Sequence, residues 1–172
     1  MSSSTAELTA AVLTVSDSSA RGQRADASGP AVSAVLQRNQ FTIVTSEIVE
    51  DESTAIEAAL IRLAGQARMV VTTGGTGIAE RDVTPEATRA VCERLLEGVA
   101  ERMRFEGAKK TPFTALSRAV CGVRGRSIIL NVPGSPSGAA ESLEAVIELM
   151  PHALRLLAGD TSHAEGALPR KL

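Results

Sequence analysis

The chain has 172 residues and a net charge of −2 at pH 7, and 44% of its residues are apolar. This length fits a single domain, the apolar content argues against wholesale disorder, and the lack of a basic excess argues against nucleic-acid binding as the main function. We expect no disulfide framework or zinc cluster, and we expect the cysteines to be small buried apolar residues, from the spacing of Cys92, Cys121, His152 and His163.

The first half of the chain predicts three strands that alternate with two helices. The polar, Ser-rich segment 1–7 is expected to be a tail, and the apolar run 8–15 is a buried strand too short to cross a membrane. No Lys or Arg precedes that run, so it does not resemble a secretory signal, and the cytoplasm is the expected compartment. The next elements are a polar loop at 17–29, a helix from Pro30 to Gln40, a strand at 41–49, a helix that begins near Ser53, and a strand at 69–73.

The second half predicts two longer helices with a strand between them. Thr84 is the expected N-cap of the first helix, with Pro85 at the first helical position, and this helix would extend to Met103 with a break near Gly98. A strand follows at 127–132. Beyond it, an apolar stripe predicts a long helix that Pro151 should kink, with Leu143, Val146, Ile147, Met150, Leu154 and Leu157 on one face.

The order of these elements indicates the fold class. Strands alternate with helices, and the strands are continuously apolar, which is typical of a parallel sheet covered on both faces. We therefore expect an α/β fold of three layers, α/β/α, with a mostly parallel sheet. No repeat or linker divides the chain, so the prediction is one domain at 8–159 followed by a polar tail at 160–172.

Polar segments follow four of the predicted strands. They lie at 16–28, 49–53, 72–84 and 131–137. In an open parallel sheet, ligands bind beyond the carboxyl ends of the strands. Loops that are distant in the sequence are therefore expected to meet at one edge of the sheet.

The segment "TTGGTGIAERDVTPEA" at 72–87 contains Gly74, Gly75 and Gly77. Glycines permit positive φ angles and close backbone approach, so their N–H groups can point at phosphate oxygens. A tight strand-to-helix turn is the simpler alternative. The loop is not a Walker A loop, because no Gly-Lys-Ser/Thr follows, and it is not a dinucleotide fingerprint, because Glu80 stands where a small residue is needed.

Three of these polar segments contain an aspartate. The candidates are Asp17, Asp51 and Asp82. Asp82 could cap the following helix, but Thr84 is expected to do so, which leaves Asp82 for a ligand. A single Asp at a strand end is most often a solvated turn residue. Several of them beside a phosphate-binding loop predict a Mg²⁺ site, since the cation would offset their repulsion of phosphate.

The last polar segment repeats this pattern. Gly134 is followed by Ser135-Pro136, which starts a helix whose free N–H groups favour an anion. Arg118 and Arg124 lie near the last strand and could add positive charge, although surface arginines are usually only solvated.

Seven short blocks of the sequence follow the order found in molybdopterin adenylyltransferases. They are "TVSDS", "DASGP", "VEDE", "TTGGTGIAERDVTPEAT", "TPFTALSR", "GVRG" and "LNVPGSP". The chain resembles this MogA and MoaB family, which is related to the gephyrin G domains, from Leu8 to Gly159. The GGTGxxxRDVTPEA pattern is highly specific to it. Competence-damage-inducible proteins share a related fold but have a different loop.

The resemblance implies a trimeric protein that binds molybdopterin and Mg-ATP. It implies transfer of AMP from ATP to the terminal phosphate of molybdopterin, with release of pyrophosphate, and delivery of the product to a molybdenum insertase of the MoeA type. Asp51 and Asp82 match the family's catalytic aspartates and would hold Mg²⁺. The expected contacts to molybdopterin or nucleotide, from the resemblance and the loop argument together, are Ser16, Asp17, Ser28, Gly74, Gly75, Thr76, Gly77, Ser117, Pro133 and Gly134.

The sequence departs from the family pattern at two places. Glu50 precedes Asp51 where many members have Pro, and Glu97-Gly98 stands where many have Pro-Gly. Two alternatives to an active enzyme are considered. The chain could be a paralogue that binds molybdopterin but has weak catalytic activity, or a scaffold in the same pathway. Both aspartates are present, which favours the enzyme, and no fused partner domain is found, which weakens the scaffold.

Overall fold

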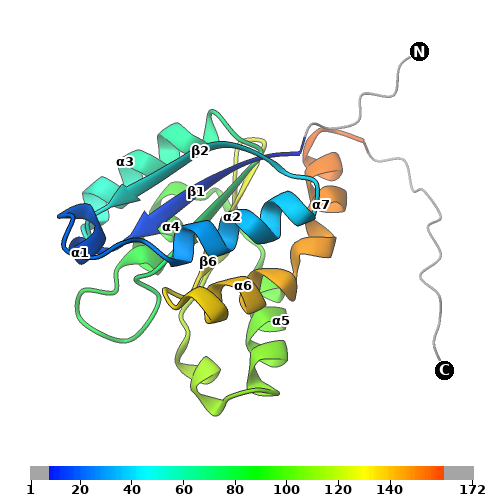
Figure 1. Ribbon diagram of the computed structural model, residues 1–172. Coiled ribbons are helices and arrows are strands. Elements are labelled where there is room, and N and C mark those ends of the chain that lie inside the picture. The colour runs from blue at the N-terminus through cyan, green and yellow to red at the C-terminus, as the bar shows by residue number, and fades with distance from the viewer. Residues whose placement is uncertain (1–7, 161–172) are drawn as a thin grey trace.

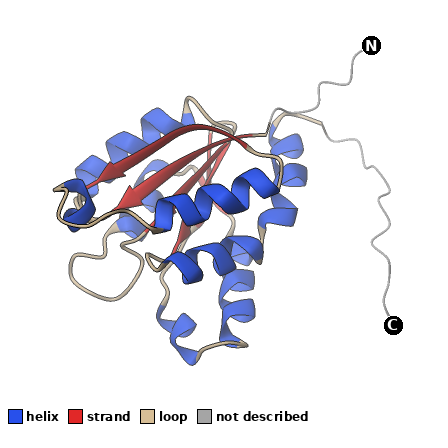
Figure 2. Cartoon of the chain, viewed as in Figure 1, coloured by secondary structure: helices blue, strands red, loops and turns tan. Residues whose placement is uncertain are grey.

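A computed structural model describes residues 8–160 of the chain as helices packed on both faces of a six-stranded sheet (Figures 1 and 2). In sheet order the strands are β2 (Thr42–Val49), β1 (Thr9–Val15), β3 (Met69–Thr73), β6 (Ser127–Val132), β5 (Cys121–Arg124) and β4 (Arg94–Leu95). The first four are parallel, and β5 is antiparallel to both of its neighbours. The predicted three-layer α/β fold with a mostly parallel sheet is confirmed.

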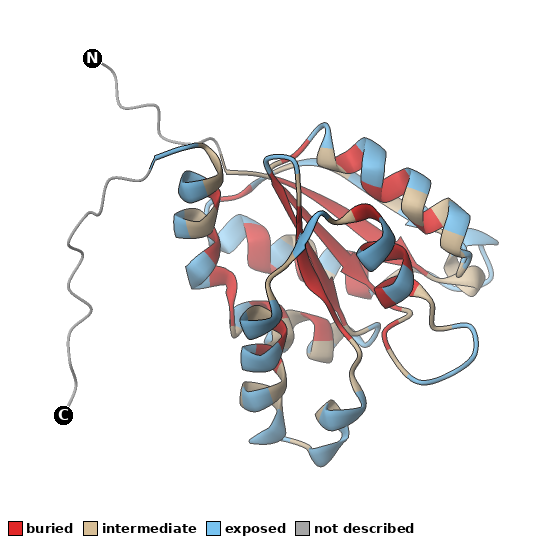
Figure 3. Ribbon diagram, turned by 180° about the vertical axis from the view of Figure 1, so that it is seen from behind, coloured by how far each residue is buried: buried red, intermediate tan, exposed pale blue. Residues whose placement is uncertain are grey.

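The central strand β1 shows why the sheet carries helices on both faces. Successive side chains of a strand point to opposite faces, and every residue of β1 beyond Thr9 is buried. Ala10 and Val12 belong to one apolar core, and Ala11 and Leu13 belong to the other. Buried residues lie along the central strands and on the helix surfaces that face them (Figure 3). The first core is covered by α2 (Ser28–Arg38), α5 (Glu97–Ala108), α6 (Pro136–Glu144) and α7 (Met150–Leu157), and the second by α3 (Ser53–Ala64) and α4 (Thr84–Val91).

The edge strand β2 differs from the prediction that every strand is covered on both faces. Its residues alternate between exposed and partly buried, and the exposed fractions of Val44 and Ile48 are 44% and 43%. β2 lies at the edge of the sheet, with β1 as its neighbouring strand, and the helices leave one of its faces exposed. Its Ile, Val and Thr residues are β-branched and favour an extended strand whether or not they are buried, so the sequence does not distinguish this strand from a fully buried one.

Besides two short 3₁₀ helices, three elements were not predicted from the sequence. The polar loop after β1 contains the short helix α1 (Asp17–Ala20), and the region between α4 and β6 contains β4 and β5. The helix predicted from Thr84 to Met103 ends at Val91 instead, because Cys92 is extended and β4 follows at once. Met103 lies on the separate helix α5.

The long C-terminal helix is interrupted before Pro151. Helix α6 ends at Glu144, the short 3₁₀ helix η2 (Ile147–Leu149) follows, and α7 begins at Met150. Pro151 lies in the first turn of α7, where its missing N–H has no helical acceptor. The predicted apolar stripe does face the core, with Leu157 partly buried and the others buried. The kink predicted at Pro151 is therefore wrong, because the helix is interrupted between Glu144 and Met150 instead.

The two cysteines are free, with Cys121 buried and Cys92 partly buried. Burial raises the pKa of Cys92 to about 11 and that of Cys121 to about 12, so both thiols stay protonated at neutral pH. None of the helices in residues 8–160 is long and apolar enough to cross a membrane. The predicted tail 1–7 and His163 lie outside the described residues, as does the predicted tail 160–172 except for Asp160.

Candidate functional site

The carboxyl ends of the four parallel strands lie side by side at one edge of the sheet. In the strand register, Val15 pairs with Val49, Thr14 pairs with Thr73, and Thr73 pairs with Val132. The residues that leave these strands are therefore neighbours. The four polar segments predicted to form a site all start at this edge, and the long loop from β3 to α4 projects from it (Figure 1).

The glycines of this loop are required by close backbone packing. Gly74 and Gly75 have φ angles of 104° and 64°, a region that favours glycine. A Cβ at Gly74 would overlap the carbonyl oxygen of Val15, and one at Gly75 would overlap Thr84 Oγ1 and lie 3.4 Å from Asp51 Oδ1. The loop thus lies directly against the end of β1 and the first turn of α4. Both the tight-turn and the phosphate-binding interpretations are compatible with this packing.

Gly134 makes the same kind of approach from the β6 end. A Cβ there would lie 3.2 Å from the Cα of Gly74. The N–H of Gly74 donates to the carbonyl of Val132 at 3.2 Å, and Thr73 Oγ1 donates to the carbonyl of Pro133 at 2.7 Å. The loops after β3 and β6 are therefore joined at the centre of the sheet edge.

Asp17 and Asp51 lie at the ends of β1 and β2 and accept hydrogen bonds from each other's backbone N–H groups. Arg81, from the loop after β3, forms an ion pair with Asp17. Burial raises the pKa of Asp51; the backbone N–H of Asp17 and the Arg81 guanidinium act in the opposite direction, while the carboxylates of Asp17 and Asp82 add to the increase. The carboxylates of Asp17 and Asp82 therefore both act on Asp51 at this edge.

Asp82 has a local structural role that the sequence did not predict. Its Oδ2 accepts from the N–H of Ala79 at 2.9 Å, and its own N–H donates to the carbonyl of Ala79 at 2.9 Å. A Cβ at Gly77 would lie 2.8 Å from Asp82 Oδ2, so the carboxylate also faces back toward the glycines. Asp82 closes the turn of the loop and is not left wholly free for a ligand.

The prediction that Thr84 caps α4 is wrong. The helix begins at Thr84 itself, after Val83, and no side chain caps it. The N–H of Thr84 donates to the carbonyl of Gly75 at 3.2 Å. Within residues 8–160, Thr84 Oγ1 is buried and has no hydrogen-bond partner. Thr84 lies inside the helix rather than at its N-cap position, so its hydroxyl does not cap α4.

Two cavities meet along the glycine loop. The smaller, of about 200 Å³, is lined by residues from all four polar segments, and the larger is a groove of about 720 Å³ between the loop, α5, α6 and the 3₁₀ helix η1 (Pro112–Leu116). The predicted site residues that line the smaller cavity are Ser16, Ser28, Asp51, Gly74, Gly75 and Gly134. Those that line the larger groove are Thr76, Gly77, Ser117 and Pro133. Asp17 and Asp82 line neither cavity.

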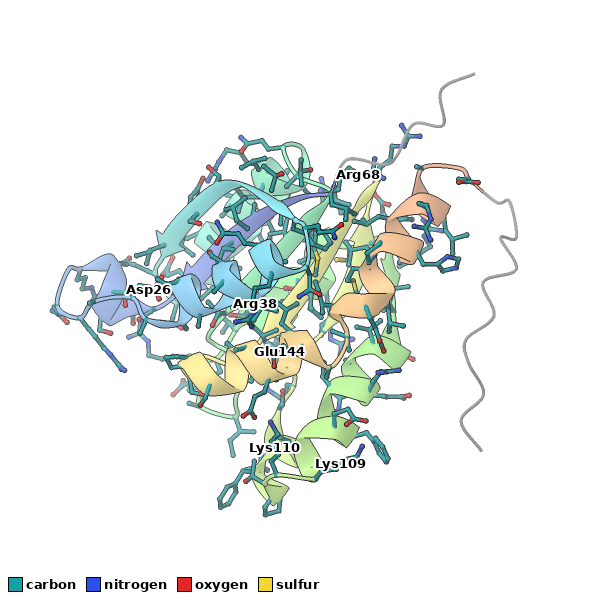
Figure 4. The ribbon with its side chains drawn as sticks, turned by 45° about the vertical axis from the view of Figure 1, so that its right-hand side comes forward. Asp26, Arg38, Arg68, Lys109, Lys110 and Glu144 are labelled. Carbon is teal, nitrogen blue, oxygen red and sulfur yellow. The ribbon has the colours of Figure 1, made fainter. Side chains whose placement is uncertain are left out.

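Asp26 lines the smaller cavity and was not predicted as a site residue (Figure 4). Its carboxylate accepts from Thr14 Oγ1 at 2.7 Å, from Ser28 Oγ at 3.3 Å and from the N–H of Gly29 at 3.0 Å. It thereby holds Ser28 at the start of α2. An Asp three residues before a backbone N–H at a helix start is a usable sequence signal for such a contact.

Arg118 and Arg124 do not provide free positive charge. Arg118 donates to the carbonyl of Gly77 at 2.7 Å and to the carbonyl of Asp82, and it pairs with Glu86. Arg124 donates to the carbonyl of Val91 at 2.7 Å. Both guanidinium groups bind within the chain in this structure, and a role as anion ligands stays a prediction.

The two departures from the family pattern have simple local surroundings. Glu50 pairs with Arg21 at 3.1 Å, so its additional charge beside Asp51 is partly offset. Glu97 lies in the first turn of α5, where a negative charge is favourable, and a Cβ at Gly98 would meet open space.

A bound metal ion would need ligands from substrate or water in addition to protein side chains. Within residues 8–160, no group of three or more His, Cys, Asp or Glu residues is placed to hold a metal ion. Mg²⁺ is usually held by one or two carboxylates together with phosphate oxygens and water. The Asp51 carboxylate lines the smaller cavity beside the glycines, and Asp82 is close enough to affect its pKa. This donor set fits a Mg²⁺ ion that arrives with a phosphate.

The family comparison covers most of the chain. Residues 11–152 match the family model described as "Probable molybdopterin binding domain". The chain is 42% identical over 153 residues to a molybdopterin adenylyltransferase of Helicobacter pylori (strain J99 / ATCC 700824), with 87% of each chain covered.

Solved structures agree with this match. The crystal structure of the molybdopterin biosynthesis enzyme MoaB from Thermus thermophilus is similar with a TM-score of 0.83 and 49% identity, over 88% of this chain and 97% of that one. A CinA protein from Thermoplasma acidophilum is similar with a TM-score of 0.66 and 17% identity, over 84% of this chain and 99% of that one. At that identity the likeness to CinA concerns the fold alone.

Proposed function

The chain belongs to the molybdopterin-binding domain family, and we propose that it is a molybdopterin adenylyltransferase. In this reaction the terminal phosphate of molybdopterin attacks the α-phosphorus of ATP. A new phosphoanhydride bond forms, the bond between the α- and β-phosphates breaks, and pyrophosphate leaves. The observation that carries the proposal is the pair of cavities that meet at the glycine loop with Asp51 beside it, since two substrates must bring their phosphates together.

The sizes and walls of the cavities support an assignment of the substrates. The larger groove has room for a pterin ring system, and Phe113, Leu116 and Met103 on its wall offer apolar surface to a flat ring. The smaller cavity has hydroxyl groups from Ser16 and Ser28 that suit a ribose or phosphate. The reacting phosphates would then lie over the Gly74–Gly77 loop.

The acidic residues would hold the metal of the Mg-ATP substrate. We assign Asp51 and Asp82 as its protein ligands. When bound, Mg²⁺ neutralises negative charge between phosphates, which is the main electrostatic obstacle to this reaction. The chain's own contribution is to fix the two carboxylates and the glycine N–H groups before the substrates arrive. The nucleophile belongs to molybdopterin, so the site needs no nucleophilic side chain.

Pyrophosphate release on mixing the protein with ATP, Mg²⁺ and molybdopterin tests this function. Release that requires all three components supports it. Tight molybdopterin binding without release would support the alternative of a catalytically weak paralogue or scaffold. Binding of neither substrate would overturn the assignment altogether.

Three further properties belong to the same proposal. We expect a homotrimer in solution, an interaction with a molybdenum insertase of the MoeA type that consumes the adenylated product, and a cytoplasmic location where ATP is available. Light scattering at micromolar concentration tests the first of these, and a monomer would contradict it. Apolar side chains that stay exposed, such as Phe105 at 67% and Phe113 at 74%, are candidates for burial in such assemblies.

A further inference from the structure

Arg118 contacts the glycine loop from behind and lines neither cavity of the candidate site. Its backbone N–H donates to the carbonyl of Thr76 at 3.0 Å, and its Nε donates to the carbonyl of Gly77 at 2.7 Å. Its Nη2 donates to the carbonyl of Asp82, and its Nη1 pairs with Glu86. One residue therefore holds both ends of the loop segment 76–82.

This segment has little else to hold it. Ile78, its large apolar side chain, is 70% exposed, and Glu80 and Arg81 are exposed as well. Inside the segment, Asp82 and Ala79 exchange hydrogen bonds, which fixes the turn but does not attach it to the sheet. Arg81 pairs with Asp17 from the middle of the segment, but its side chain is 63% exposed, and exposed pairs contribute little. Without apolar burial, the position of the segment depends mainly on the polar contacts at its ends.

We propose that Arg118 is a positioning residue for the adenylyl transfer. It joins the carbonyls of Gly77 and Asp82 with one planar guanidinium, and so fixes the Asp82 carboxylate against Gly77. The inference rests on the proposed function for its catalytic consequence. The positional consequence does not, because it concerns the loop of the unliganded chain.

The guanidinium geometry is essential to this role. Arginine presents several N–H donors in a rigid plane, so it reaches two carbonyls and a carboxylate at once. Lysine has the same charge but a single ammonium on a flexible stem. Arg118→Lys should therefore fail to restore the loop, whereas a role that needs only positive charge would tolerate lysine.

The ion pair with Glu86 is the competing explanation. Both side chains are substantially exposed, at 38% for Arg118 and 53% for Glu86, and such surface pairs contribute little. Glu86→Gln removes that pair and leaves both carbonyl contacts in place. It therefore separates the positioning of the loop from a simple surface ion pair.

Hydrogen exchange of the unliganded protein tests the positional part. Arg118→Ala and Arg118→Lys should speed exchange of the 76–83 amides by about tenfold or more, because two charge-assisted hydrogen bonds are lost. Glu86→Gln should leave these amides unchanged. The matched control is Arg126→Ala, which removes the Arg126 bond to the Ala158 carbonyl at the opposite end of β6. If Arg126→Ala or Glu86→Gln speeds exchange of the loop as much as Arg118→Ala, the inference is wrong.

Pyrophosphate release tests the catalytic part. Arg118→Ala should lower kcat by about tenfold or more and raise the Mg²⁺ concentration for half-maximal rate, while the KM for molybdopterin changes by less than about threefold. Arg118→Lys should not rescue the rate. Equal loss in kcat and in molybdopterin affinity would indicate a general structural defect and overturn the positioning role. If the wild-type protein releases no pyrophosphate, the proposed function fails, and the exchange experiment still decides the role of Arg118.

Discussion

Asp17 and Asp51 are joined by a reciprocal pair of hydrogen bonds at the carboxyl edge of the sheet. The N–H of Asp17 donates to Asp51 Oδ2 at 2.9 Å, and the N–H of Asp51 donates to Asp17 Oδ1 at 3.1 Å. The pair fixes the ends of β1 and β2 and holds two carboxylates close together. Burial is the largest reason that the pKa of Asp51 is raised, and the Asp17 carboxylate adds to it. A carboxylate whose charge is disfavoured in the free protein is suited to a cation-binding role.

The first prediction concerns stability without metal. Asp51→Asn should leave unchanged or raise the free energy of unfolding at neutral pH, because it removes the disfavoured charge and keeps an oxygen that accepts from the Asp17 N–H. The folded state binds the Asp51 proton more tightly than the unfolded state does. The stabilising contribution of Asp51 is therefore complete below its ordinary pKa of 3.8, and it is lost as the pH rises through the raised folded pKa.

Urea unfolding of the wild type and of Asp51→Asn, from below pH 3.8 to neutral pH, measures how the difference in their unfolding free energies changes with pH. The advantage of Asp51→Asn over wild type should increase as the pH rises above 3.8 and then level off. Added Mg²⁺ and ATP should stabilise the wild type more than the variant. A variant that becomes less stable than wild type as the pH rises would contradict the assigned environment of Asp51.

The second prediction concerns catalysis by the two proposed metal ligands. Asp82→Asn should keep the fold, since the amide oxygen can still accept from Ala79, but it should lower adenylation by at least ~10²-fold. Asp51→Asn should behave similarly. The double variant should lose far less than the product of the single losses, because both residues would serve one ion.

Glu80 provides the matched control for this pair. It is exposed on the same loop, and Glu80→Gln should change the rate by less than about threefold, as surface substitutions do. Pyrophosphate release should be measured across a Mg²⁺ titration. Near-normal turnover of Asp82→Asn at limiting Mg²⁺ would show that the assigned role is wrong.

The third prediction separates two glycines of the loop. Gly75→Ala should destabilise the protein by about 1–3 kcal/mol, because its positive φ and the overlap with Thr84 strain the fold. Gly77→Ala meets only the movable end of Asp82, so its unfolding free energy should change by less than about 1 kcal/mol. It should nevertheless lower pyrophosphate release, because the added methyl displaces the Asp82 carboxylate. Full activity of Gly77→Ala would argue against a role for the position of Asp82.

The parts of the fold predicted from the sequence are those governed by local patterns. β1, β3 and β6 each contain a run of apolar residues, and that pattern is typical of strands buried on both faces. β4 and β5 escaped prediction because they have only two and four residues and are defined by pairing, β5 with β6 and β4 with β5. The break after α6 also escaped, because the apolar stripe continues across it.

The candidate site divides in the same way. The glycine loop and Asp51 were predicted because the ends of parallel strands must meet at one edge. The roles of Arg118 and Thr84 depend on the folded path of the loop. Arg118 reaches a carbonyl 41 residues away, and α4 begins one residue earlier than expected, with Thr84 inside the helix and its N–H donating to the carbonyl of Gly75. Capping rules take account of neighbouring residues and not of such closures.

The last prediction concerns the two threonines at the start and middle of α4. Within the described part of the chain, Thr84 Oγ1 is buried without a partner, whereas Thr88 Oγ1 accepts from Asn131 Nδ2 at 2.9 Å. Valine has nearly the shape of threonine without the hydroxyl. Thr84→Val should therefore leave the unfolding free energy unchanged or raise it by about 1 kcal/mol. Thr88→Val should lower it by about 1–3 kcal/mol, because one buried N–H of the Asn131 amide loses its acceptor while the other still donates to Thr72.

Activity then distinguishes a functional hydroxyl from an unused one. A buried unpaired hydroxyl is unfavourable, and Thr84 Oγ1 lies directly against Gly75, whose loop would contact the phosphates. We expect a small shift of that loop on ATP binding to give the hydroxyl a partner, so Thr84→Val should weaken ATP binding by roughly tenfold despite its undiminished stability. Calorimetry with Mg-ATP measures this directly. Wild-type affinity in Thr84→Val would mean that the hydroxyl has no part in binding and that the loop does not move toward it.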